Sequence, residues 1–353
     1  MQNQYVEFNI SNDMLKNCRI DRNVGSPKSI AVPEGIVCIG KDAMQKFRCP
    51  KLIMPSTLKT IEKRAFKDAI IEVFDFGECK LERIEDYAFE RCTARAELPD
   101  TVEYIGANCD LKMDIENKME SKIKLPKALK CISAIGINLN YVTEVELQES
   151  MIRQDSNLLN WLHSSISSGD WVTLQVFRDG KELYRLVHDK RWRVDSNKYR
   201  YIGPQGILYD RYDSRFEDSL YSRCKVFMAA YRLIWPTDLP EDIEKKYRLY
   251  VRNNFLALIS GKEEDFESIR MFNNAGLITA FRLKQLLENA TKKKNVAVFQ
   301  ENGFDLFFVG FRSLTPNRIE SACLDPPSRL PSLRLMLLSK NRHQIESCHK
   351  YTH

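Results

Sequence analysis

Hydrophobic and polar positions recur with a short period over the first 135 residues of the chain. Isoleucines at positions 39, 61, 84, 105 and 132 are separated by 22, 23, 21 and 27 residues. Aliphatic–proline pairs precede most of them, at Val32-Pro33, Met54-Pro55, Leu98-Pro99 and Leu125-Pro126. A unit this short cannot bury its own apolar side chains and must stack on its neighbours. The period therefore predicts a solenoid with one short strand per turn, whose intervening charged residues face solvent.

The same repeat defines the side chains that we expect in its core. A small–aromatic step follows the isoleucine in the clearest units, as Ala65-Phe66 and Ala88-Phe89. Proline has no amide N–H, so the recurring prolines should lie at a strand edge or in the turn before a strand. The positions expected in the repeat core are Ile39, Ile61, Phe66, Ile84, Phe89, Ile105 and Ile132.

These units resemble the BspA-type bacterial leucine-rich repeat, which reads approximately LP-x-x-(L/V)-x-x-I-(G/E)-x-x-A-F and then a cysteine. The resemblance covers residues 30–135, and its best units run from Met54 to Phe66 and from Leu81 to Cys92. Elsewhere the pattern decays, since Met44 replaces the aromatic residue and residues 110–122 insert a charged run. The resemblance implies a curved right-handed solenoid that contacts proteins or ligands and has no catalytic residues.

After the repeats, a period of two predicts a β-hairpin. Residues 171–177 alternate apolar and polar side chains, and residues 183–187 form a second apolar run. Between them, Asp179-Gly180 is a strong signal for a two-residue turn. We therefore expect two antiparallel strands here.

From Tyr209 onward the apolar spacing becomes helical. It predicts a helix over 216–234 that Pro236 ends, and a second that opens at Pro240 with carboxylates in its first turn. A shorter helix over 266–272, capped by Gly276, and another over 277–293 complete a run of antiparallel helices. Residues 265–290 resemble a degenerate ankyrin-type helical hairpin, and an ordinary helix pair is the alternative.

These patterns predict an α+β protein with a leucine-rich-repeat solenoid, a β-hairpin element and a mainly α-helical C-terminal module. We expect an N-terminal cap at 1–23, the solenoid at 24–135, and a linker with the hairpin at 136–205. The helical module then covers 206–300, and 301–353 is a poorly folded tail because prolines at 316, 326, 327 and 331 interrupt it.

Composition bounds the class of protein. The 353 residues are 43% hydrophobic, and no apolar run approaches the roughly 20 residues that span a bilayer. The first residues contain neither a basic leader nor an apolar core, so we expect a cytoplasmic protein with no membrane partner. None of the ten cysteines forms a C-x-x-C pair, which favours reduced core thiols.

Known catalytic motifs are missing from the sequence. It contains no phosphate-binding glycine loop, no G-x-S-x-G and no H-E-x-x-H, so we expect neither an enzyme nor a cofactor. The C-terminal Cys and His residues lack the spacing of a zinc site, and we expect no metal.

Two functions remain open. The first is a non-catalytic scaffold that binds a protein partner through the solenoid face. The alternative is a nucleic-acid-associated protein, because one segment interleaves bases and aromatic rings. The candidate nucleic-acid residues are Lys190, Arg191, Trp192, Arg193, Lys198 and Arg200. The net charge of +6 is modest and favours an acidic partner only weakly.

Overall fold

The structure is a computed structural model. It describes residues 6–20, 28–93, 95–113, 122–140, 142–154, 157–166, 171–192, 194, 199–203, 205–219, 222–258, 264–279, 281–282 and 285. The chain divides into two compact units, Met1–Arg248 and Leu249–His353.

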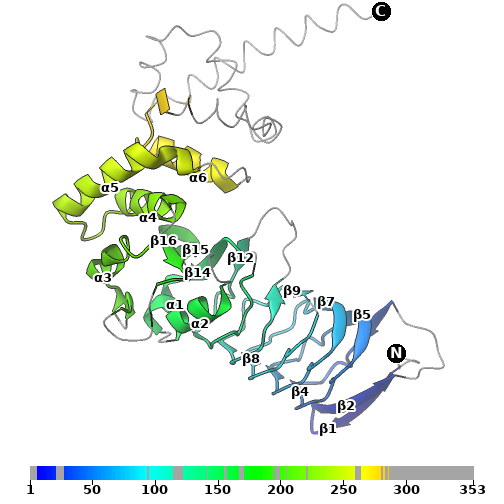
Figure 1. The fold of residues 1–353 in the computed structure, drawn as a ribbon. Coiled ribbons are helices and arrows are strands. Elements are labelled where there is room, and N and C mark those ends of the chain that lie inside the picture. Colours follow the sequence, from blue (N-terminus) through cyan, green and yellow to red (C-terminus); the bar gives the residue numbers. More distant parts are fainter. Residues whose placement is uncertain are drawn as a thin grey trace, which may run out of the picture. The chain divides into compact units, whose positions relative to one another are not determined.

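The first unit begins with a solenoid that has two sheets (Figure 1). The seven-stranded isoleucine sheet contains, in spatial order, β1 (Val6–Ser11), β2 (Met14–Ile20), β4 (Cys38–Ile39), β6 (Thr60–Ile61), β8 (Arg83–Ile84), β10 (Tyr104–Ile105) and β13 (Cys131–Ile132). The five-stranded sheet contains β11 (Lys112–Met113), β9 (Arg95–Ala96), β7 (Ile70–Asp75), β5 (Arg48–Ile53) and β3 (Ser29–Ala31). The prediction of one strand per turn is therefore wrong, because the segment before each aliphatic–proline pair forms a strand as well.

The isoleucine ladder begins earlier than the isoleucine period indicates. Leu15 of β2 pairs with Ile39 in parallel register, and Ile39 pairs with Ile61 in the same way. Leu15 is fully buried, as are the isoleucines that follow it. At this first position of the ladder, a leucine is buried as the isoleucines are at the later positions. A pattern of recurring isoleucines therefore does not reveal it.

Prolines stand between the two sheets. Pro55 follows the end of β5 and precedes β6, and its carbonyl accepts a hydrogen bond from the Leu58 N–H at 3.2 Å. The neighbouring Met54 N–H donates to the Asp75 carbonyl of the next turn at 2.9 Å. Since the proline lies outside both ladders, its missing N–H costs no sheet hydrogen bond.

The corner after each isoleucine strand uses left-handed backbone. Asp42, Arg64, Tyr87 and Asn108 have φ of 55°, 60°, 60° and 53° at equivalent places in four successive turns. Asparagine and aspartate tolerate this region, whereas arginine and tyrosine are strained there. The left-handed conformation at these corners is therefore imposed by stacking of the turns rather than by the backbone preference of each residue.

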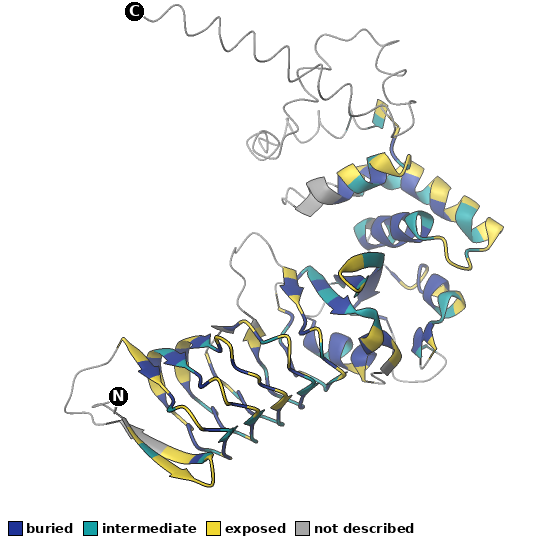
Figure 2. Ribbon diagram, turned by 180° about the vertical axis from the view of Figure 1, so that it is seen from behind, coloured by how far each residue is buried: buried dark blue, intermediate teal, exposed yellow. Residues whose placement is uncertain are grey.

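Buried positions alternate with exposed ones along the turns of the solenoid (Figure 2), and several of the buried side chains are aromatic. Phe66 stacks on Phe89 with ring centroids 5.3 Å apart and meets Phe74 edge-on at 4.9 Å. Phe66 and Phe89 come from corners of successive turns, and Phe74 comes from β7 of the five-stranded sheet. The cluster therefore joins the two sheets across the core and couples neighbouring repeats.

The predicted hairpin is confirmed. β15 (Trp171–Arg178) and β16 (Lys181–Asp189) pair antiparallel around Asp179 and Gly180, whose φ values of 51° and 77° fit a type I′ turn. The hairpin continues a sheet with β12 (Lys122–Lys124) and β14 (Glu144–Gln148), in the order β12-β14-β15-β16. Beside it lie α1 (Glu149–Gln154) and α2 (Leu158–Ser165), and the short pair β17 (Ile202–Gly203) and β18 (Gly206–Ile207) follows.

The helical prediction is correct in part. The helix expected over 216–234 begins later, as α4 (Ser222–Ile234), and a separate short helix, α3 (Tyr209–Ser214), precedes the expected range. The Arg215 N–H bonds to the Tyr212 carbonyl three residues earlier, which tightens and ends α3. Phe216 is nevertheless buried, since its ring packs from this turn on Tyr247 at 4.9 Å. The next helix, α5 (Glu241–Asn254), starts directly after Pro240 as predicted.

In the second unit, the structure describes η1 (Phe255–Leu258) and α6 (Glu264–Asn274). Gly276 caps α6 with φ of 70°, and the Leu277 N–H bonds to the Phe272 carbonyl at 2.9 Å in a Schellman motif. Most of the predicted helix over 277–293 and the whole tail over 301–353 lie outside the described residues. The ankyrin-type resemblance is therefore unconfirmed.

We expect Phe66→Ala to lower the free energy of unfolding by about 3–5 kcal/mol, because the cavity would open where two repeats and both sheets meet. Urea denaturation followed by circular dichroism would measure the change. Glu72→Ala is the control, since this exposed side chain on β7 should change stability by less than about 0.5 kcal/mol. Equal effects of the two substitutions would contradict the role given to the aromatic cluster.

Candidate interaction surfaces

All the residues predicted for the repeat core lie inside the solenoid. The exposed fraction of each side chain is 0% or 1% for Ile39, Ile61, Phe66, Ile84, Phe89, Ile105 and Ile132. These residues hold the repeats together and offer no atoms to a partner. A binding surface must come from the residues that alternate with them.

The outward row of the isoleucine sheet is largely satisfied by its own neighbours. The Arg83 guanidinium lies 3.9 Å from the centre of the Tyr104 ring on the next strand. A hydrogen bond to Glu85 raises the pKa of Arg83 further above its ordinary value. Beside this row, Lys59 pairs with Glu82 at 3.2 Å, and Lys130 pairs with Glu103 at 2.7 Å. The charged side chains on this face therefore interact with one another.

The outward face of the five-stranded sheet differs, because it exposes large apolar side chains. Ile70 and Val73 of β7 are 41% and 43% exposed. The register places Arg48 of β5 beside Ile70, and Lys51 beside Val73. Lys51 also forms an ion pair with Asp75 at 2.7 Å. An apolar centre with a charged rim is the usual anatomy of a protein-binding surface.

Sequence reasoning missed this pair for a physical reason. β5 and β7 are paired on either side of Pro50, and the register resumes between Lys51 and Val73. Opposite Pro50, which cannot donate to the ladder, alternation breaks in β7 and two successive residues, Glu72 and Val73, are both exposed. The hydrophobic run around Val73 consequently looks like continuous core in the sequence. In the sequence, Pro50 of the neighbouring strand is the feature that signals this break in alternation.

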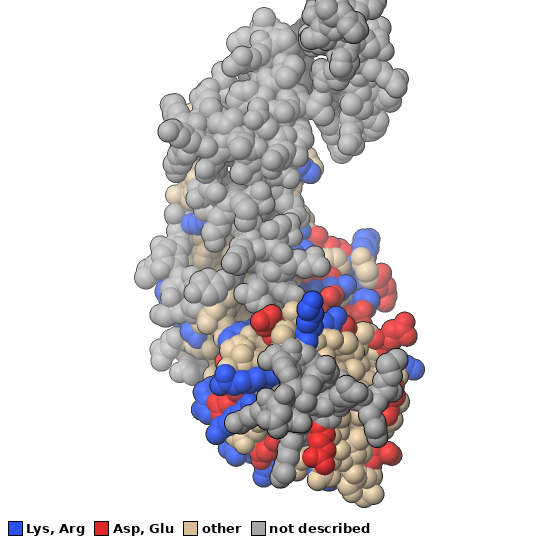
Figure 3. Space-filling model, turned by 90° about the vertical axis from the view of Figure 1, so that its right-hand side faces the viewer, with Lys and Arg blue, Asp and Glu red and all other residues tan. Residues whose placement is uncertain are grey.

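Charges of both signs are mixed on the surface of the protein. Figure 3 shows Lys and Arg side chains interspersed with Asp and Glu on the face drawn there. Several exposed pairs connect neighbouring repeats, such as Arg91 with Asp68 at 2.6 Å. Long-range attraction of a highly charged polymer needs a field of one sign, which this face does not provide.

The structure commits the described residues of the basic and aromatic segment to internal contacts. Trp192 is 0% exposed, so its ring has no surface on which a base could stack. Lys190 donates to the His163 carbonyl, and burial lowers its pKa. Arg200 lies 3.5 Å from the Asn160 side-chain oxygen. Arg193 and Lys198 lie outside the described residues.

Arg191 is held by the buried carboxylate of Asp189. The Arg191 Nε donates to Asp189 Oδ1 at 2.8 Å, and the Ser219 hydroxyl donates to Oδ2 at 2.9 Å. Burial opposes the ionisation of Asp189, but the hydrogen bonds from Arg191 and Ser219 outweigh it and hold its pKa below the usual range. The pair thus fixes the end of β16 to the segment before α4.

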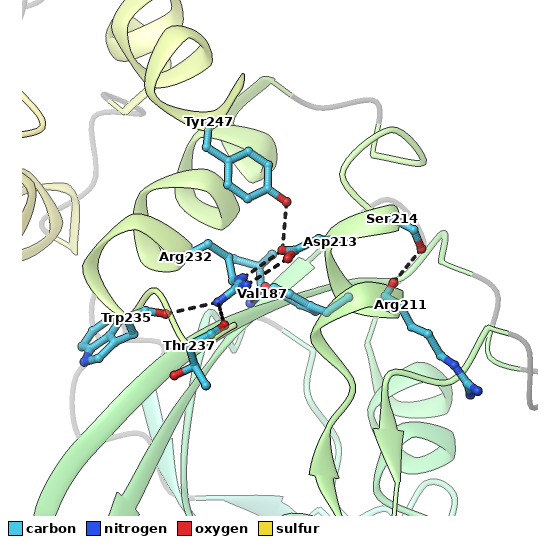
Figure 4. A network of polar contacts seen from close by, with 9 residues as sticks. Val187, Arg211, Asp213, Ser214, Arg232, Trp235, Thr237 and Tyr247 are labelled. Atoms are coloured by element: carbon cyan, nitrogen blue, oxygen red, sulfur yellow. Dashed lines mark hydrogen bonds and ion pairs between the residues drawn. The ribbon is translucent and has the colours of Figure 1, made fainter. Parts of the chain in front are cut away.

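A second buried ion pair joins three helices. Arg232 of α4 donates from Nε and Nη2 to the two carboxylate oxygens of Asp213 in α3, at 2.8 and 2.9 Å. The Tyr247 hydroxyl of α5 donates to the same carboxylate at 3.0 Å (Figure 4). Arg232 Nη1 also donates to the carbonyls of Trp235 and Thr237. Every group is engaged within the protein, so the arrangement is structural.

A hollow of about 600 Å³ lies beside this ion pair, lined in part by Tyr209, Asp210, Glu217 and Asp238. Glu217 is itself bound by Lys225 and Lys246, which lower its pKa, with Lys246 the larger cause. Within the described ranges, no three His, Cys, Asp or Glu side chains are grouped so as to hold a metal ion.

Cysteine side chains in the solenoid are poor nucleophiles. Burial raises the pKa of Cys49 to about 12 and that of Cys79 to about 11. Burial also raises the pKa of Cys38 to about 11, with Glu62 as the next cause. A thiol that stays protonated at neutral pH packs as a small apolar group.

His188 is a fully buried imidazole at the centre of an aromatic cluster. Its Nδ1 lies 2.8 Å from the Tyr201 hydroxyl, and its ring meets Trp192 edge-on at 5.8 Å. Burial, and then the nearby His163, lower the pKa of His188 to about 3. The ring is therefore neutral at physiological pH.

The fold defines a leucine-rich-repeat solenoid with a sheet-and-helix segment at its C-terminal end. Residues 9–133 match the family model of the BspA type leucine-rich repeat region in six copies, so this part of the chain is a BspA-type leucine-rich repeat region. The match starts within β1 and includes the rung at Leu15.

No curated protein matches the chain. A similar solved structure is titled "The Crystal structure of Pneumococcal vaccine antigen PcpA", with 17% sequence identity and a TM-score of 0.28. The alignment covers 54% of this chain and 54% of that chain, so this chain spans about half the length of that structure. Among the described residues, no helix is long and apolar enough to cross a membrane.

We expect Arg232→Met to lower the free energy of unfolding by about 3–5 kcal/mol, because it leaves the Asp213 carboxylate buried without a cation. Combining it with Asp213→Asn should recover part of the loss, since no buried charge then remains. Urea denaturation of the three variants would measure this. A double variant less stable than the sum of the single effects would contradict it.

The neutral His188 should make the protein less stable in mild acid. Its folded pKa of about 3 lies below the ordinary value of 6.5, so between these pH values the unfolded chain binds more protons. The free energy of unfolding should therefore fall as pH falls, by up to about 1.4 kcal/mol per pH unit from this group. His188→Gln should remove most of this slope between pH 6 and pH 4, as measured by urea denaturation. His163→Gln should retain most of the slope, because burial, the larger cause, still lowers the pKa of His188. An unchanged slope in His188→Gln would refute the assignment.

Proposed function

We propose that this protein is a non-catalytic scaffold that binds a protein partner through the outward face of the five-stranded sheet. The observation that carries the proposal is the exposure of Ile70 and Val73 at the middle of that sheet. Solvent-exposed β-branched side chains in a structured strand cost hydration free energy that a partner would recover.

The choice between the two sheets rests on length and on charge. β5 and β7 have six residues each, whereas β4, β6, β8, β10 and β13 of the isoleucine sheet have two, and only its N-terminal strands β1 and β2 are as long. The paired long strands β5 and β7 therefore make the broadest part of the five-stranded sheet. The isoleucine sheet instead presents side chains that already contact one another, such as Arg83 on Tyr104, and a partner would have to break these contacts.

The partner chemistry follows from the rim. Arg48 stands beside Ile70 on the neighbouring strand, and Lys112 is exposed at the far edge of the sheet on β11. A partner with an apolar centre, carboxylates facing Arg48 and Lys112, and a donor group facing the exposed Glu72 would complement this surface. The buried Trp192 and the internal contacts of Lys190 and Arg191 give no support to nucleic-acid binding.

A reducing compartment is consistent with this proposal. The described cysteines Cys38, Cys49, Cys79, Cys92, Cys109, Cys131 and Cys224 are all thiols rather than disulfides. Disulfides form and persist in oxidising compartments and are rare in cytosolic proteins. We therefore propose the cytoplasm as the location.

We expect the double variant Ile70→Glu, Val73→Glu to reduce partner recovery at least tenfold, because it places charge at the centre of the contact and repels acidic groups. The full chain would serve as bait in source-cell extract, with quantitative mass spectrometry of the bound proteins. Ile135→Glu is the matched control, since Ile135 is also exposed, at 37%, but lies outside this face. A partner that survives the double variant, or that Ile135→Glu removes equally, would disprove the proposed surface.

A further inference from the structure

The N-terminal hairpin leaves one edge of the isoleucine sheet open. β1 stands at the end of the seven-stranded order, and β2 is its neighbour on one side. Among the described residues, no strand pairs with its other side. Figure 2 shows much of this hairpin as exposed, and Ile10 is 42% exposed. An edge of six residues offers a row of backbone donors and acceptors to another strand.

Other sheet edges in the described part of the chain are short or blocked. β3, β11 and β13 have three, two and two residues, and α2 packs against β13. β12 carries lysines at both ends, and the outer edge of β16 is closed where the Val187 N–H donates to the Tyr212 hydroxyl at 2.7 Å. Short edges, lysines and covering groups are the devices by which proteins prevent edge pairing.

β1 has none of these devices. Its sequence, VEFNIS, contains no proline and no lysine, and apolar residues alternate with polar ones along its length. The extra residue that shifts the register of the hairpin lies in β2, where Asn9 faces Asn17 and Ile10 faces Leu15. β1 itself is therefore an unbroken strand, and it differs from the protected edges elsewhere in the protein.

We propose that β1 pairs antiparallel with β1 of a second copy of this chain, with the two-fold axis at Phe8. In this register Phe8 faces Phe8 of the copy, Glu7 faces Asn9, and Val6 stands opposite Ile10. Apolar positions meet apolar positions, and the single carboxylate faces an amide rather than another carboxylate. A contact of this kind is isologous and closes as a dimer.

The alternative registers are less favourable. Shifting the pairing by one residue places Glu7 opposite Ile10 and Phe8 opposite Asn9, so apolar side chains lose their apolar partners. Shifting it by two residues puts Asn9 on the axis and keeps Phe8 opposite Ile10, but leaves Val6 without a partner in the strand. Only the register centred on Phe8 pairs all three apolar residues with one another. The two isoleucine sheets would become one continuous sheet through the dimer.

The contact area limits the strength of this dimer. One strand pair and its adjacent side chains bury less than the roughly 1,000 Å² typical of stable interfaces. We therefore expect a concentration-dependent equilibrium, with a Kd on the order of 1–100 μM. Sedimentation velocity of the full chain would cover concentrations from about 1 to about 200 μM, a range set around that Kd. The sedimentation coefficient should shift from that of a monomer to that of a dimer as the concentration rises.

A charge exchange at the two-fold axis tests the register. Phe8→Lys and Phe8→Glu should each be monomeric over the same range, because like charges would face each other across the axis. An equimolar mixture of the two should recover the dimer, which shows that both variants remain folded and competent. Asn17→Lys is the control, since it adds the same charge to β2, away from the paired edge, and should leave the dimer intact.

Three results would overturn the proposal. These are a wild-type protein that stays monomeric at the highest concentration, a dimer that persists in both Phe8 variants, and a mixture of the variants that does not associate. Loss of the dimer in Asn17→Lys would also contradict it, because that residue lies on the inner strand of the hairpin.

Discussion

Every other feature of this protein depends on one constraint: no single repeat can bury its own apolar face. Each turn contributes about 22 residues, and its isoleucine is covered only when the next turn pairs with it in register. The strained backbone at Arg64 and Tyr87 is maintained because stacking over-determines the corner. The same requirement leaves an uncovered turn at each end of the array.

The two ends of the solenoid are closed in different ways. At the C-terminal end, the Trp161 indole N–H donates to the Ile137 carbonyl at 3.1 Å, and Ser164 accepts from the Ile135 N–H. α2 thus covers the last rung while β14 begins the next sheet. At the N-terminal end a hairpin continues the isoleucine sheet, so one end of the array is finished by a helix and the other by a strand with an open edge.

Charges in the protein separate into buried pairs that fix elements and exposed pairs that connect repeats. Asp213 and Arg232 are nearly inaccessible and hold α3 against α4. Arg91 is exposed and Asp68 is half-buried, and solvent screens the attraction within such a surface pair. What distinguishes the surface is instead the apolar pair Ile70 and Val73 on β7, beside the basic Arg48.

The sequence by itself determined the repeat, its buried isoleucines and aromatics, the hairpin turn at Asp179-Gly180 and the start of α5 after Pro240, because these depend on local spacing and local backbone preference. It did not determine the second strand of each turn, the rung at Leu15 or the break between α3 and α4, since each depends on which residue stacks next to it. The basic and aromatic segment shows the difference most clearly. Lys190, Arg191 and Trp192 resemble a binding patch in the sequence, but tertiary packing buries the indole and gives the cations internal partners. Periodicity specifies which residues face inward, whereas exposure of Ile70, Val73 and the edge of β1 is decided only by neighbours distant in the chain.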